Sequence, residues 1–219
     1  MRQDNGISEN DTPRTSLSPH TSAANGLTGA VDTLSPQAHN ILNLHRETAY
    51  LKPVAPKHGD DDARAFLELL TPDQLLAVPV RRQNAARAML AGLWLWHDWL
   101  DGSHAISQTL HDSTGSFWHA IMHRREGDFP NSKYWYAKAG SHPILPSIGV
   151  HVGTAINHLP ADKSLLRVVR GGWDPEAFVD LVEDVSGRRD DPRLAAVVAI
   201  QRIEWQMLFD HCTREASGG

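Results

Sequence analysis

The chain has 219 residues, of which 41% are hydrophobic and 21% charged, and a formal net charge of −5. This composition is typical of a soluble globular protein of one compact domain. The acidic balance predicts no nucleic-acid partner, because phosphate binding needs a basic face, and the single cysteine, Cys212, excludes an intramolecular disulfide and a cysteine-based zinc cluster.

Membrane and export signals are missing from the sequence. No apolar run reaches the length of a membrane span, and the N-terminus lacks the basic-then-apolar pattern of a signal peptide. We therefore expect no membrane contact and a cytoplasmic location.

Residues 1–34 are rich in Ser, Thr, Asn, Asp and Gly and contain almost no clustered apolar residues. Such a segment buries too little apolar surface to offset the entropy lost on ordering. The sequence predicts a disordered tail over 1–34 and one helical domain over 35–219.

Helix signals follow in chain order from the start of that domain. Ser35 before Pro36 is typical of a helix N-terminus, as is the Thr-Pro pair that opens residues 71–78. Residues 60–70 form a short amphipathic pattern with acidic residues in its first turn, and a longer helix is predicted over 81–96.

Two further helices are predicted near the C-terminus, where Asp174 precedes Pro175 and Asp191 precedes Pro192. Alternating strand patterns are nearly absent, and residues 164–170 (SLLRVVR) are the one short candidate. The predicted fold class is all-α, a bundle of helical hairpins.

Residues 81–143 contain an internal repeat with a shift of 29 positions. Each unit is predicted to be a helix, a tight turn and a second helix, with turns at Asp98 and Gly127. Small residues recur at matching places, which would let paired helices approach closely; they are Ala91, Ala120, Ser103 and Ser132.

The second unit, HRREGDFPNSKYWYAKAGSHP, resembles the tetratricopeptide repeat in its Gly-Asp-Phe turn, its small Ser132 and its Pro143. The resemblance covers about 60 residues, the period is shorter than the usual ~34, and no third copy follows. The chain also resembles an uncharacterised microbial family built around WHD…GSFWHAIMHRREGDF…KYW. These resemblances imply helical hairpins and leave the function open.

One face of the helix that begins near Ser116 carries His119, His123 and Glu126, because residues three, four and seven apart share a face. Two imidazoles at i and i+4 can bind one metal ion, and a carboxylate one turn later can support them. The alternative is a pair of histidines that are packed and hydrogen-bonded in a helical core.

Other polar residues lie on apolar faces. Glu204 shares a stripe with Val197 and Ile200, and a carboxylate there needs a partner, a metal or a proton. His97 continues the stripe of the helix over 81–96; a continuing helix would add Asp101 and His104 to that stripe, but a break near Asp98 favours His97 alone.

These inward groups predict one pocket in which Glu204, His97 and Glu126 act as catalytic residues and His119 and His123 bind a divalent metal (Zn, Mn or Fe). Metal-free acid–base catalysis by Glu204 and a histidine is an alternative. A buried salt bridge from Glu204 to Arg124 or Arg125 is another.

Basic and aromatic residues around the same helix are candidates for substrate binding, with a solvated surface or a core position as the alternative. They are Arg124, Arg125, Lys133, Trp118 and Trp135. Two functions remain open. One is a metal-dependent hydrolase or lyase acting on a small polar or anionic substrate; the other is a helical module that binds a protein partner.

Overall fold

A computed structural model describes residues 33–159 and 162–219 of the chain. The elements in this part of the chain are α1 (Pro36–Asn43), α2 (Asp61–Leu67), the 3-10 helix η2 (Pro72–Gln74), α3 (Gln83–Trp96), α4 (Leu100–Ser107), α5 (Ser113–Glu126), α6 (Phe129–Ala139), α7 (Leu145–Ile156), α8 (Lys163–Arg167), α9 (Pro175–Val185) and α10 (Leu194–Ser217). The one extended pairing in the described residues is an isolated bridge between Leu34 and Leu76. The predicted all-α class is confirmed.

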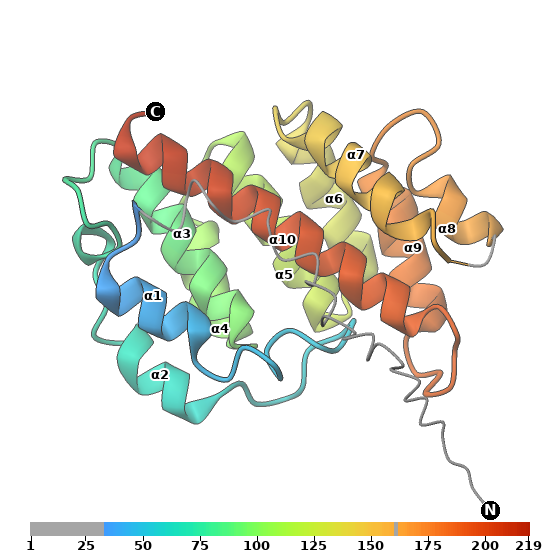
Figure 1. Cartoon of the computed structure of the whole chain (residues 1–219), viewed down its shortest axis with the longest axis horizontal. Helices are drawn as coiled ribbons and strands as arrows, with labels where there is room; N and C mark the ends of the chain where they lie inside the picture. Colours follow the sequence, from blue (N-terminus) through green and yellow to red (C-terminus); the bar gives the residue numbers. More distant parts are fainter. Residues whose placement is uncertain (1–32, 160–161) are drawn as a thin grey trace, which may run out of the picture.

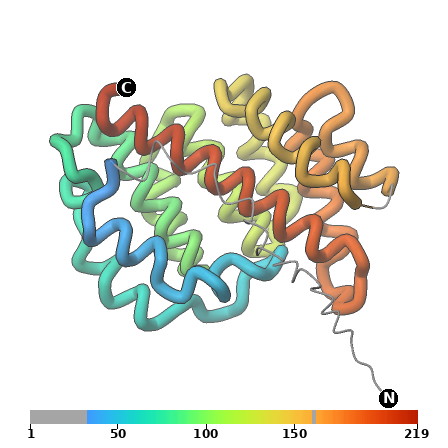
Figure 2. Tube along the Cα trace, viewed as in Figure 1, coloured from blue at the N-terminus to red at the C-terminus, as the bar shows by residue number. Residues whose placement is uncertain are grey.

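Two antiparallel hairpins, α3–α4 and α5–α6, form the centre of the molecule, and α4 packs against α5. The long helix α10 crosses the molecule (Figure 1). The C-terminal part of α10 packs on α3, and the start of α10 contacts α9. The tube in Figure 2 shows α1 and α2 at one end of the molecule and α7, α8 and α9 at the other. The site described below lies where α4, α5 and α6 meet.

Both predicted hairpin turns are present. Asp98 has a φ of 62° between α3 and α4, and Gly127 has a φ of 92° between α5 and α6. Left-handed backbone suits glycine best, and aspartate tolerates it better than most other residues do. The four small residues of the repeat are fully buried, as close helix packing requires. The likeness to tetratricopeptide repeats stays a prediction.

The N-terminal boundary of the domain lies earlier than predicted. Leu34 was assigned to the tail, but it is buried, and Ser35 next to it caps α1 by accepting a hydrogen bond from the N–H of Ala38 (3.1 Å). The rest of the predicted tail, residues 1–32, lies outside the described residues.

Two local features differ from what the sequence indicates. The one short strand candidate, residues 164–170, is the helix α8 and a following turn, because Asp162 caps its first N–H groups. Asp191 does not cap α10, which begins three residues later at Leu194; its carboxylate binds Arg193 instead. Asp174 caps α9 as predicted, through the N–H of Ala177 (2.9 Å).

The centre of the core is a group of packed aromatic rings, which are stacked, tilted or edge-to-face. Trp205 lies 4.6 Å from Trp96, 4.8 Å from Phe209 and 6.1 Å from Trp118 between ring centroids. The Trp205 indole N–H donates to the carbonyl of Gly92 (2.9 Å). Trp118 is therefore a core residue, and its predicted role in substrate binding is not supported by its position.

Among the described residues, no helix has both the length and the apolar character that crossing a bilayer demands.

Candidate functional site

Three histidines meet between α4 and α5. His104, His119 and His123 each offer one ring nitrogen, and these nitrogens all lie within 4.8 Å of one another. The Asp98 turn reverses the chain after α3, so that α4 packs against α5 and brings His104 to the pair predicted from the sequence. We call these three residues the three-histidine cluster.

His119 is the most enclosed member of the cluster, with 3% of its surface exposed. Its ring stacks on Trp135 at 3.9 Å and on His123 at 4.8 Å. Burial, with the neighbouring rings of His123 and His104, lowers the pKa of His119 to about 4. The ring is therefore neutral at physiological pH, and its Nδ1 has no hydrogen-bond partner among the described residues.

His123 is oriented by two neighbours. Its Nδ1 lies 3.0 Å from the Glu126 carboxylate, which can only accept, so this nitrogen donates. In the tautomer with its hydrogen on Nδ1, Nε2 accepts from the Asn131 side-chain amide at 3.0 Å. A carboxylate that holds the second nitrogen of a metal-binding histidine is a recurrent feature of metal sites. The Asn131 amide would turn aside, or offer its oxygen, when an ion binds.

This geometry suits a transition metal, because three neutral imidazoles are good ligands for zinc, copper, iron or nickel. Tetrahedral zinc with bonds of about 2.0–2.1 Å sets its ligand atoms about 3.3–3.4 Å apart. The nitrogens would therefore draw together from their present separation of up to 4.8 Å. His104 is only half-buried and can turn to close this gap.

Glu204 does not join the histidines. It is fully buried, and its carboxylate pairs with Arg124 and accepts a hydrogen bond from the hydroxyl of Tyr136 (2.7 Å). Arg124 also donates to the Tyr136 oxygen. This closed triad matches the salt-bridge alternative, so Glu204 is placed as a structural residue rather than as the predicted catalytic base, and Arg124 is not at the surface.

Electrostatics keep the charge on Arg124. Burial opposes that charge, but the attraction of the Glu204 carboxylate and its hydrogen bond contribute to an opposing effect that exceeds burial in total, so the pKa of Arg124 is raised. Burial also raises the pKa of Tyr136 well above its usual value. The hydroxyl therefore stays protonated and remains a donor to the carboxylate.

Arg125 is buried as well, and it fixes a loop. Its guanidinium donates to the carbonyl of Lys52 and pairs with Asp98, and it lies over the Tyr50 ring at 4.2 Å. Arg125 therefore ties the loop between α1 and α2 to the turn after α3, and its buried position does not support the substrate-binding role predicted for it.

His97 lies apart from the cluster, at the end of α3. Its Nε2 donates to the carbonyl of Ile41 (2.9 Å), and its Nδ1 lies 3.7 Å from the Asp60 carboxylate. Burial lowers the pKa of His97, although the Ile41 hydrogen bond and Asp60 oppose the shift. The single pocket predicted for His97, His119 and Glu204 is instead three separate environments.

The remaining predicted residues lie nearer the surface. Lys133 is half-exposed and pairs with Asp180 on α9. Glu126 is exposed and contacts the cluster only through His123. Trp135 is half-buried against His119 and is the one predicted aromatic residue that touches the cluster.

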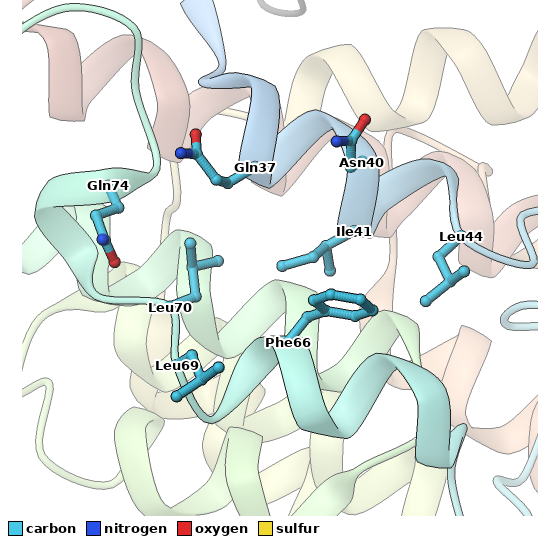
Figure 3. Close-up of a pocket in the computed structure, with 8 residues that line it drawn as sticks. All are labelled: Gln37, Asn40, Ile41, Leu44, Phe66, Leu69, Leu70 and Gln74. Atoms are coloured by element: carbon cyan, nitrogen blue, oxygen red, sulfur yellow. The ribbon is translucent and has the colours of Figure 1, made fainter.

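A separate apolar groove of about 400 Å³ opens between α1 and α2 (Figure 3). Phe66 and Leu69 project there with 56% and 78% of their surfaces exposed. None of its lining residues is ionisable; they are Gln37, Asn40, Ile41, Leu44, Phe66, Leu69, Leu70 and Gln74. The groove suits binding rather than catalysis.

Comparison with known proteins gives no relative: no family model matches the chain, and no curated protein or solved structure does.

Proposed function

We propose that the three-histidine cluster binds one divalent transition metal, zinc in the first instance, and that the protein is a metal-dependent hydrolase or lyase acting on a small polar or anionic substrate. The observation that carries the proposal is the convergence of three imidazole nitrogens within 4.8 Å from two different helices. The unpartnered Nδ1 of the buried His119 supports it, because a buried polar atom without a partner is costly.

Three protein ligands leave the fourth position of a tetrahedral zinc ion open, which is typical of catalytic rather than structural sites. A metal at such a position lowers the pKa of a bound water or polarises a carbonyl group. In the proposed site Glu126 orients His123 and lies near enough to the surface to exchange a proton with solvent. Trp135 holds the His119 ring in place and forms one wall.

Cobalt substitution tests the proposal, because tetrahedral Co²⁺ bound by histidines has intense visible absorption. Metal-stripped protein should develop this absorption with Co²⁺, and His104→Ala should abolish it while the far-UV circular dichroism stays unchanged. His111→Ala is the matched control, since this histidine is exposed and lies outside the cluster. Zinc-loaded protein is then assayed on ester, phosphoester and amide substrates.

A tetrahedral spectrum that is lost in His104→Ala, with turnover of one substrate class lost in the same variant, would support the enzyme. A spectrum that His104→Ala leaves unchanged would reject the metal site. A normal site without turnover on any class would leave metal binding in place and reject hydrolysis.

The second candidate function is a protein-interaction module, and the apolar groove between α1 and α2 favours it. An amphipathic helix that places its apolar side chains in a hydrophobic groove is a common mode of recognition. Phe66 and Leu69 are the exposed apolar side chains that such a helix would cover. Leu69→Glu should then abolish binding of an amphipathic peptide without changing the Co²⁺ spectrum.

A further inference from the structure

We propose a second cation site, formed by His45, Asp60 and His97 where the start of α2 meets the end of α3, which binds a divalent transition metal such as zinc. It shares no residue with the three-histidine cluster. The inference goes beyond the function proposed above and stands on separate contacts.

The orientation of the His97 ring leaves one nitrogen available. Its Nε2 lies 2.9 Å from the Ile41 carbonyl oxygen, which can only accept, so Nε2 carries the hydrogen. In the neutral ring Nδ1 then presents a lone pair. The side chain is fully buried, and Nδ1 has no hydrogen-bond partner among the described residues. Metal-binding histidines commonly donate their second N–H to a backbone carbonyl in this way.

That lone pair faces another acceptor. Oδ2 of Asp60 lies 3.7 Å from Nδ1 of His97, with 21% of the aspartate side chain exposed. Oδ2 already accepts a hydrogen bond from Nδ1 of His45 (2.7 Å), so Nδ1 of His97 is the atom without a partner, and leaving a buried polar atom unpaired is costly. A metal ion satisfies both atoms at once.

Asp60 is held firmly by its other groups. Its Oδ1 caps α2 by accepting from the N–H groups of Asp62 (3.1 Å) and Ala63 (3.3 Å). Its own N–H donates to the His97 carbonyl (3.0 Å), and its carbonyl accepts from the Trp99 indole (2.7 Å). Oδ2 is therefore presented in a fixed position, as a preorganised ligand should be.

The residue before Asp60 makes this approach possible. A Cβ added to Gly59 would lie 2.4 Å from the His97 carbonyl oxygen and 2.8 Å from the Trp99 ring. Only glycine lets the two backbones come so close. The close approach aligns Asp60 with the end of α3.

His45 completes the set from the opposite side. Its Nδ1 lies 2.7 Å from Oδ2 of Asp60, and its Nε2 lies 3.9 Å from a carboxylate oxygen of Asp62. Zinc ligands in a tetrahedron are about 3.3–3.6 Å apart, so the His97–Asp60 separation already fits closely. To bind the ion, the half-exposed His45 has to move back by about 0.6–0.9 Å on the same criterion, and its hydrogen has to pass from Nδ1 to Nε2, because Nδ1 now donates to Oδ2.

A small cavity adjoins Asp60 and His97. Its volume is about 60 Å³, several times the ~10–15 Å³ that one water needs. The cavity is lined by Thr48, Ala49, Asp60, Trp96, His97 and Asp98. An ion there has room to keep a water as a further ligand.

Titration of zinc into the metal-stripped full-length protein, monitored by calorimetry, tests the site. The wild type should bind two equivalents, one at each site. His45→Ala should weaken one of them at least tenfold, since losing even a supporting neighbour of a ligand costs about 10–100-fold. His58→Ala is the matched control, because this exposed histidine lies two residues before Asp60 and outside the cluster.

Nitrogen-15 resonances of the His97 ring give a second readout, since Nδ1 should shift on zinc binding in the wild type and not in His45→Ala. Unchanged titrations of His45→Ala, with no shift at His97 Nδ1, would overturn the proposal. The two sites fail independently: His104→Ala should remove only the other equivalent, and its loss would say nothing against this site.

Discussion

His123 and Arg124 are neighbours in α5, but their side chains point into different environments. Arg124 points to a triad in which Glu204 matches its charge and Glu204 and Tyr136 accept hydrogen bonds from its two terminal nitrogens, while its Nε has no partner among the described residues. His123 points to a cluster in which the Nδ1 of His119 has no partner among the described residues. Burial alone therefore does not indicate an active site, and neither does one unsatisfied buried atom; the convergence of three ring nitrogens from two helices is the more informative sign.

The two regions should also differ in what their loss costs. Removing one partner of a buried ion pair leaves the other charge uncompensated in the core, and this is strongly destabilising. Removing a half-exposed histidine such as His104 leaves no such charge. We therefore expect the triad to control stability and the three-histidine cluster to control metal binding.

Glu204→Gln should have the largest effect on stability. It leaves Arg124 charged and buried without its counter-ion, so the free energy of unfolding should fall by about 3–5 kcal/mol. Urea denaturation measures this loss, with the exposed Glu126→Gln as the control, which should change stability by less than about 1 kcal/mol.

Zinc binding by the folded fraction of Glu204→Gln should match the wild type. The double variant Arg124→Met/Glu204→Leu should recover most of the lost stability, because an apolar pair of similar volume can replace a buried ion pair. A small loss of stability in Glu204→Gln, or a loss of zinc binding by its folded fraction, would contradict the expectation that the triad controls stability and the three-histidine cluster controls metal binding.

Asp210 is a second buried carboxylate on α10, and it has no basic partner as close as Arg124 is to Glu204. Burial raises the pKa of Asp210 to about 6, although Gln206 and Arg214 oppose the shift. The unfolded chain releases this proton at a lower pH than the folded protein does, so stability falls as pH rises from about 4 through 6 and stays reduced above it.

Asp210→Asn should therefore raise the free energy of unfolding by roughly 2–3 kcal/mol at pH 8 and change it little at pH 4. Urea denaturation at the two pH values measures the difference. The exposed Asp190→Asn should show no such pH dependence. An equal gain at both pH values would mean that the effect comes from packing and not from the charge.

Lys133→Ala should have the smallest effect. Lys133 and Asp180 form a half-exposed pair, and such pairs contribute about 0–1 kcal/mol. We expect thermal unfolding to change only slightly and zinc affinity not at all. A tenfold change in zinc affinity would assign Lys133 to the site, as the sequence first indicated.

Local sequence signals predicted the helices well where capping and turn chemistry decide the structure. Ser35 and Asp174 cap helices as expected, and the breaks at Asp98 and Gly127 define the two hairpins. The short strand candidate at 164–170 is helical instead, because a cap at Asp162 outweighs the pair of β-branched residues at its end.

The candidate site was only partly predictable. Helical spacing placed His119 and His123 on one face, but it could not show that the Asp98 turn brings His104 to them. Periodicity also showed that Glu204 and His97 point inward without showing which partner each one meets. From the sequence, a salt bridge between Glu204 and Arg124 is only one of the alternatives, because the angle between the helices decides which partner Glu204 meets.

Zinc content after dialysis is the most direct test of whether the three-histidine cluster binds a metal ion. Protein purified without a histidine tag is dialysed against zinc, then against buffer, and measured by elemental analysis beside His104→Ala and His111→Ala. We expect His104→Ala to hold one equivalent less zinc than the wild type and His111→Ala do, with the same helical content. Equal zinc content in all three folded proteins, or no zinc in any, would contradict it.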